Sequence, residues 1–113
     1  TVFDPKNGPT YRDMLPEPPP AELAPSCSEA GVLGVLPGIV GTLQALEALK
    51  LILGIGDPLI GRYLAFDALD MTFREFKIRK DPSNPITWEN RDQIQVTELE
   101  GLCQPAPLQP PAA

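Results

Sequence analysis

The chain has 113 residues and a formal net charge of −6, with 9 Lys and Arg against 15 Asp and Glu. This length allows one domain with a modest core. The acidic balance argues against non-specific nucleic-acid binding, which needs basic patches that displace counterions.

The 15 prolines lie mostly before Ser26 or after Leu102, so both ends are expected to be extended or irregular. Regular structure is expected between about residues 32 and 78. This is a small core, which suggests a piece of something larger or an obligate partner. The first residues show no charged and apolar signal-peptide pattern, so a cytoplasmic protein is expected.

Residues 1–31 are predicted to form a proline-rich N-terminal strap. Asn7-Gly8 indicates a turn, and residues 16–20 read Pro-Glu-Pro-Pro-Pro, which favours polyproline geometry. Such a segment crosses a surface as a semi-rigid strap. A disordered leader is the alternative.

A long apolar helix is predicted over about residues 32–54. Its apolar positions alternate at spacings of three and four residues, as in Leu36, Ile39, Leu43 and Leu46. Pro37 suits a first helical turn and Gly54 suits the C-terminal cap.

The apolar run of this helix has about the length of a membrane span. However, Gln44, Glu47 and Lys50 lie on one face, which favours a buried helix of a soluble protein, and the last two are expected to pair. Small residues at Gly34, Gly38 and Gly41 indicate that another element approaches the backbone closely.

A β-hairpin is predicted over residues 62–80. Residues 62–68 and 72–79 each alternate apolar and polar side chains, and Leu69–Met71 would form the loop. The predicted class is therefore α+β: an extended strap, one long buried helix and a C-terminal antiparallel hairpin. Residues 83–113 are expected to be an irregular tail or linker, with a turn of helix near Val96–Glu100.

The chain has two cysteines, Cys27 and Cys103, too few for a disulfide framework. Two free thiols in a reducing compartment and one disulfide between them both fit. Cys27 stands between serines near the start of a helix, where a thiolate is stabilised. It is a candidate nucleophile, and an inert buried cysteine is the alternative.

Other common catalytic features are missing from the sequence. There is no glycine-rich phosphate loop, and there is no histidine to act as a general base.

Two stretches together resemble a known family. Residues 26–32 read Ser-Cys-Ser-Glu-Ala-Gly-Val, and residues 41–50 read Gly-Thr-Leu-Gln-Ala-Leu-Glu-Ala-Leu-Lys. They are similar to the C-terminal part of the MoeB/ThiF family, bacterial relatives of ubiquitin-activating enzymes. The resemblance covers residues 1–82, with a weaker similarity up to Cys103.

The resemblance implies the C-terminal lobe of a Rossmann-like activating-enzyme fold. Family enzymes use ATP and Mg²⁺ to adenylate the C-terminal Gly-Gly of a ubiquitin-like sulfur carrier of the MoaD/ThiS type. The product serves molybdopterin, thiamin or thiolated-tRNA synthesis. The nucleotide site would lie in an adenylation domain, in this or another chain, so this chain should not adenylate alone. Cys27 would accept the acyl group or carry a persulfide.

The resemblance also places a zinc site, for which the family uses two Cys-x-x-Cys pairs. The matching positions here are Thr10, Asp13, Asn84 and Thr87. None is cysteine, and Thr and Asn are poor zinc ligands. Zinc is therefore predicted to be absent, and other contacts must replace it or leave the lobe looser.

Two interpretations without catalysis remain open. The chain would be a module that docks a ubiquitin-like protein or completes another subunit, or its long helix would form a homodimer seam. Arg74, Lys77, Arg79 and Lys80 form a basic cluster. It fits a solvated strand face, or a surface that meets an acidic carrier.

Overall fold

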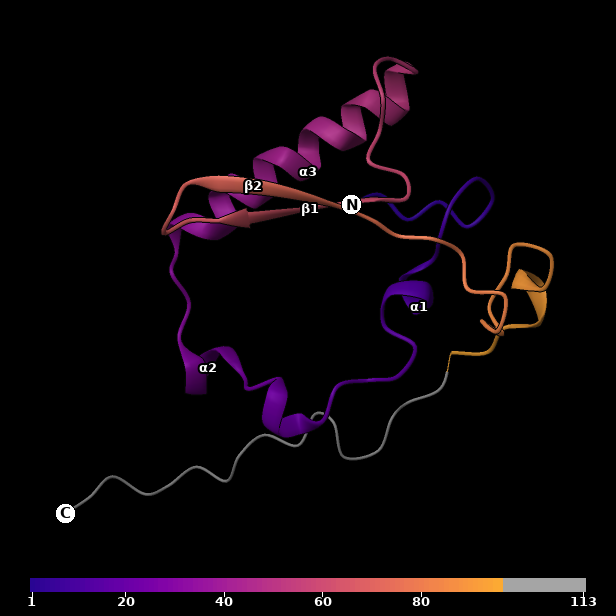
Figure 1. The fold of residues 1–113 in the computed structure, drawn as a ribbon, viewed down its shortest axis with the longest axis horizontal. Coiled ribbons are helices and arrows are strands. Elements are labelled where there is room, and N and C mark those ends of the chain that lie inside the picture. The colour runs from indigo at the N-terminus through magenta and orange to yellow at the C-terminus, as the bar shows by residue number, and fades with distance from the viewer. Residues whose placement is uncertain (97–113) are drawn as a thin grey trace.

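The computed structural model describes residues 1–96 and contains one long helix, one two-stranded antiparallel sheet and several short helical turns (Figure 1). In chain order the elements are α1 (Tyr11–Met14), the 3-10 turn η1 (Ala21–Leu23), α2 (Cys27–Ala30), α3 (Val35–Leu53), β1 (Arg62–Asp67), β2 (Thr72–Lys77) and the 3-10 turn η2 (Arg91–Gln93). This content agrees with the predicted α+β class.

Helix α3 confirms the predicted long helix, although it begins at Val35 rather than near residue 32. Pro37 lies in its first turn, where a missing N–H costs nothing. Gly54 ends it in the left-handed conformation, with φ 63°, and donates its N–H to the carbonyl of Lys50. Glycine adopts this conformation without a Cβ penalty, as the sequence predicted.

The prediction that this helix is buried is wrong for the described residues. No residue of α3 is buried, and Leu46, Leu49 and Ile52 are 53%, 53% and 78% exposed. The reason is that no other helix or strand of residues 1–96 packs against α3. No atom lies within 4 Å of a Cβ built on Gly34, Gly38 or Gly41, so the close approach expected there is not made by these residues either.

Strands β1 and β2 form the predicted hairpin, with Arg62 opposite Lys77 and Asp67 opposite Thr72. Cross-strand aromatic pairs support this register. Phe66 stacks on Phe73 with ring centroids 4.8 Å apart, and the rings of Tyr63 and Phe76 lie 6.3 Å apart. Every residue of β2 is exposed, so neither face of this strand is covered by the described residues.

The N-terminal residues pack along the segment that leads into β1. Val2 forms a parallel bridge with Ile60, and its N–H donates to the carbonyl of Leu59 at 2.9 Å. The turn that follows brings Gly8 to a buried position against Ile60 and Pro9 to a buried position beside Gly61. This contact is the best-packed part of the described chain.

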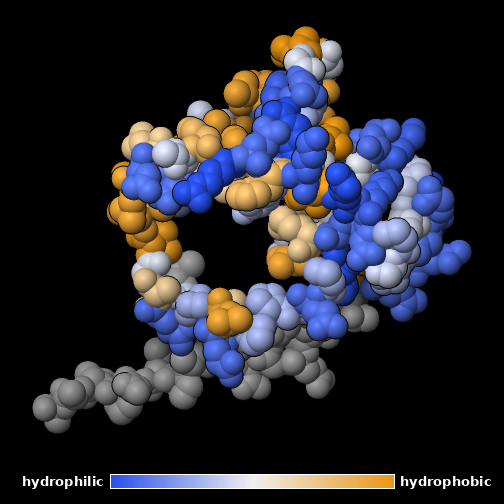
Figure 2. All heavy atoms as spheres, viewed as in Figure 1, coloured by the Kyte–Doolittle hydropathy of each residue, from blue (hydrophilic) through white to orange (hydrophobic). Residues whose placement is uncertain are grey.

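Beyond Tyr11 the strap is less extended than predicted, because it contains α1, η1 and α2. From about residue 16 to residue 34 it runs away from α3 and the hairpin (Figure 1). The space-filling view shows the opening that this leaves and the apolar side chains over α3 (Figure 2). Apart from Val96, the expected helical turn at 96–100 lies outside the described residues, as does Cys103.

Candidate functional site

The backbone of Cys27 lies at the first residue of α2, a four-residue helix, and not at the start of α3. Ser26 and Glu29 explain why a helix begins here. The Glu29 carboxylate accepts the backbone N–H of Ser26 at 2.9 Å and its hydroxyl at 3.1 Å. This is the glutamate half of a capping box, the Ser-x-x-Glu pattern of a helix start.

Helix α2 is a single turn, so its macrodipole is small, and Glu29 places a negative charge in that turn. Both features weaken the expectation that a helix start at residue 27 favours a thiolate.

The structure brings three of the four expected zinc positions together. The side-chain amide of Asn84 donates from Nδ2 to Oδ1 of Asp13 at 2.8 Å and to Oγ1 of Thr10 at 3.0 Å. Thr10 donates to Oδ2 of Asp13 from its backbone N–H at 2.6 Å and from its hydroxyl at 3.0 Å. The backbone N–H of Asp81 donates to Oδ1 of Asp13 at 2.8 Å.

These bonds change the acidity of Asp13. Partial burial alone would raise the pKa of this carboxyl. The donors from Asp81, Thr10 and Asn84 stabilise the charged form more strongly and lower the pKa from 3.8 to about 2. Asp13 is therefore ionised throughout the neutral range.

The donor set does not fit a structural zinc ion. Two hydroxyls, one carboxylate and one amide stand where the family has thiolates, and among residues 1–96 no group of three or more His, Cys, Asp or Glu side chains is placed to hold a metal. The fourth position, Thr87, lines the same shallow pocket of about 200 Å³. Its hydroxyl bonds to Asn90 Oδ1 at 3.2 Å instead.

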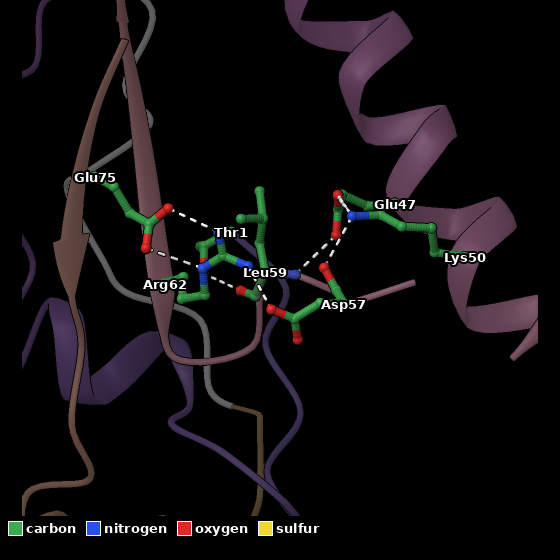
Figure 3. Close-up of polar contacts among 7 residues, drawn as sticks. All are labelled: Thr1, Glu47, Lys50, Asp57, Leu59, Arg62 and Glu75. Atoms are coloured by element: carbon green, nitrogen blue, oxygen red, sulfur yellow. Dashed lines mark hydrogen bonds and ion pairs between the residues drawn. The ribbon is translucent and has the colours of Figure 1, made fainter. Parts of the chain in front are cut away.

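A second polar network joins α3 to the hairpin (Figure 3). Glu47 forms an ion pair with Lys50, as predicted, and accepts the backbone N–H of Leu59 at 2.8 Å. Lys50 donates to the carbonyl of Asp57 at 3.0 Å. Burial alone would raise the pKa of Glu47, but the bonds from Lys50 and Leu59 lower it.

The same network continues into the sheet. Arg62 donates from Nε and Nη2 to the two carboxylate oxygens of Glu75 at 3.0 and 2.7 Å, and from Nη1 to Asp57 at 2.8 Å. The bond from Arg62 lowers the pKa of Glu75. The sequence showed the spacing of Glu47 and Lys50, but nothing in it indicated that both meet the 57–59 loop.

The basic cluster is spread over the end of the hairpin and does not form one site. Arg74 and Lys77 lie on exposed β2, and Arg79 and Lys80 follow it. Lys80 donates to the carbonyl of Pro5 at 3.1 Å, so this lysine contacts the N-terminal segment.

The pattern of the ThiF family matches residues 1–86, and the chain belongs to this family. The chain is 48% identical over 96 residues to the sulfur carrier protein adenylyltransferase of Thermus thermophilus, covering 85% of this chain and 35% of that protein. It is 54% identical over 88 residues to the probable adenylyltransferase/sulfurtransferase MoeZ of Mycobacterium tuberculosis, covering 78% and 22%.

A similar protein also occurs in an animal. The adenylyltransferase and sulfurtransferase MOCS3 of Xenopus laevis is 40% identical over 104 residues, covering 91% of this chain and 23% of that protein. The chain thus spans about a third or less of the length of each relative named here. No solved structure matches it significantly.

Proposed function

We propose that this chain supplies the C-terminal lobe of an ATP-dependent adenylyltransferase that activates a ubiquitin-like sulfur carrier. The observation that carries the proposal is the family match over residues 1–86, together with relatives named for sulfur-carrier adenylation. The lobe would span residues 1–82 and residues 83–113 would form a tail or linker. ATP and Mg²⁺ would bind in an adenylation domain outside this stretch.

The exposed side of α3 supports this role. Glu47 and Lys50 hold one side of the helix to the 57–59 loop, while Leu46, Leu49 and Ile52 stay more than half exposed. Burial of such side chains stabilises by about 1.5–3 kcal/mol each, so a solvated helix of this composition is costly. We propose that the adenylation domain, in the same or another chain, covers it.

Cys27 would act on the adenylated carrier. Its thiolate would attack the carbonyl carbon of the acyl-adenylate, a thioester would form, and the bond to AMP would break so that AMP leaves with the electron pair. Persulfide transfer from the same sulfur is the alternative chemistry. The strap would lie over the carrier's C-terminal tail.

Intact mass spectrometry tests this step. The chain is mixed with carrier activated as its C-terminal acyl-adenylate, with and without reductant. A carrier adduct that maps to Cys27, is kept in Cys103→Ala and is lost in Cys27→Ala is expected. An unmodified chain that still co-elutes with the carrier would refute the covalent role and favour a docking module.

The second candidate function is that of a non-catalytic module that binds a ubiquitin-like protein, completes another subunit or forms a homodimer. In this candidate the unburied apolar side of α3 would be the contact surface. Light scattering separates its forms: a mass that rises with concentration and falls in Leu49→Glu supports a homodimer. A constant mass with carrier binding supports docking.

We place the protein in the cytoplasm, without membrane or nucleic-acid partners. Val35–Leu53 is long and apolar enough to cross a membrane by length and composition, a test that core helices of soluble proteins also pass. Glu47 and Lys50 near its C-terminal end, both bonded to the 57–59 loop, support the soluble assignment. A net charge of −6 is unfavourable for nucleic acid.

A further inference from the structure

The residues at the expected zinc positions form an arrangement of their own. We propose that Asp13 is the hub of a metal-free latch, in which four hydrogen-bond donors enclose its carboxylate and fasten residues 10–13 to residues 81–84. The latch takes the place of the zinc ion that the family resemblance implies. It makes this part of the fold independent of metal supply and of thiol oxidation.

The Asp13 carboxylate has no free acceptor position. A carboxylate offers about four lone-pair positions on its two oxygens. Oδ1 accepts from the Asp81 N–H and the Asn84 amide, both at 2.8 Å, and Oδ2 accepts from the Thr10 N–H at 2.6 Å and its hydroxyl at 3.0 Å. A cation would have to displace one of these donors.

Each donor hydrogen on the side chains of this cluster also has an acceptor. The Thr10 hydroxyl donates to Asp13 and accepts from Asn84, whose two amide hydrogens serve Thr10 and Asp13. The Asn84 carbonyl oxygen accepts the N–H of Ile86 at 3.0 Å. The amide orientation is therefore fixed by its partners, and no polar atom of these three side chains is left unpaired.

The arrangement also reverses the charges of a zinc-thiolate site. That site is a cation enclosed by anionic sulfurs, whereas this one is an anion enclosed by donors. A single cysteine at position 10 or 84 would take a donor away from the carboxylate without completing a zinc site.

The latch is a tertiary contact and not only a local cap. The bonds between Asp13 and Thr10 close one turn of α1, but the donors from Asp81 and Asn84 come from 68 and 71 positions further along the chain. Lys80 reinforces the junction from the same loop by donating to Pro5. Removal of the carboxylate should therefore separate two distant segments.

Metal analysis and amide hydrogen exchange of the purified protein test the latch. After growth with excess zinc, the wild type is expected to hold no stoichiometric zinc and to keep its exchange pattern with a chelator. In Asp13→Ala the Asp81 amide should exchange about tenfold faster. The control Asp70→Ala, in the exposed hairpin loop, should leave Asp81 unchanged.

The Ile78 amide, which donates to Gly61, serves as the internal reference for global unfolding. If Asp13→Ala also accelerates exchange at Ile78, Asn84→Ala decides, because it keeps the Asp13 carboxylate and its bonds to Thr10 while it removes the Asn84 amide, with its bonds to Asp13, Thr10 and Ile86. Faster exchange at Asp81 with Ile78 unchanged supports the latch. Unchanged Asp81 exchange overturns it.

A reconstruction tests the link to zinc. The variant Thr10→Cys/Asp13→Cys/Asn84→Cys/Thr87→Cys is expected to bind one zinc and to lose Asp81 protection when a chelator is added. If this variant takes up no zinc, the latch does not stand where the family has its zinc site, and that part of the proposal is overturned. One zinc per chain in the wild type would overturn the proposal as a whole.

Discussion

Glu47 on α3 accepts a hydrogen bond from the backbone N–H of Leu59, with 2.8 Å between Oε2 and the nitrogen. The carbonyl of Leu59 in turn accepts the N–H of Val2 at 2.9 Å and the hydroxyl of Thr1 at 3.1 Å. Leu59 thus joins the long helix to the N-terminal residues through hydrogen bonds of its own N–H and carbonyl groups.

The first prediction concerns this junction. Glu47→Ala leaves the Leu59 N–H without a partner and should lower the free energy of unfolding by about 1–3 kcal/mol. Gln44→Ala, an exposed position on the same helix, should change it little. Urea unfolding followed by circular dichroism measures both variants, and equal effects would contradict the role of Glu47.

The second prediction concerns the bidentate ion pair between Arg62 and Glu75 across the hairpin. Arg62→Lys keeps the charge but loses the paired bonds to both carboxylate oxygens, so the midpoint of thermal unfolding should fall at low salt. High salt should shrink the difference. Arg74→Lys on the neighbouring exposed strand is the matched control and should have no measurable effect.

The third prediction concerns how the stability of the protein depends on pH in acid. Because the folded-state pKa of Asp13 lies below its ordinary value of 3.8, its bonds contribute full stability above that pH. This contribution is lost as the pH falls from 3.8 to about 2. Asp13→Asn should unfold more easily at neutral pH and show a flatter pH dependence in that window. The same acid slope in both proteins would contradict the prediction.

The fourth prediction concerns the best-packed contact of the chain. A Cβ at Gly8 would collide with Cγ2 of Ile60, so Gly8→Ala should cost about 1–3 kcal/mol. Ile60→Ala in the same chain removes the collision, so the double variant should lose less than the sum of the two single losses. Thermal unfolding of the four proteins of this cycle measures the coupling, and strict additivity would argue against the contact.

The fifth prediction separates the helix from its proposed cover. Gly38→Ala adds a methyl group where no described atom lies within 4 Å, and it should stabilise α3 by up to about 1 kcal/mol in this chain. If an adenylation domain approaches the glycine side closely, the same variant should bind that domain more weakly. Unchanged affinity in a binding titration would show that the partner lies elsewhere.

The sequence by itself determined the local elements. Periodicity, Pro37 and Gly54 predicted α3 to within a few residues at its start, and alternation predicted the two strands of the hairpin. Helix caps, turn chemistry and side-chain period act over a few residues, so these features can be predicted without knowledge of the whole fold. The family resemblance rests on the same local order of residues.

Only the tertiary structure decided what α3 faces and what happens at the expected zinc positions. The sequence predicted a buried helix, yet no described residue covers it, because burial depends on what packs against a helix and not on its composition. The sequence showed that Thr10, Asp13 and Asn84 are not cysteines. Asn84 lies some 70 positions beyond Thr10 and Asp13 in the chain. The three side chains meet around the Asp13 carboxylate only because the tertiary fold places residues 10–13 beside the segment that follows the hairpin.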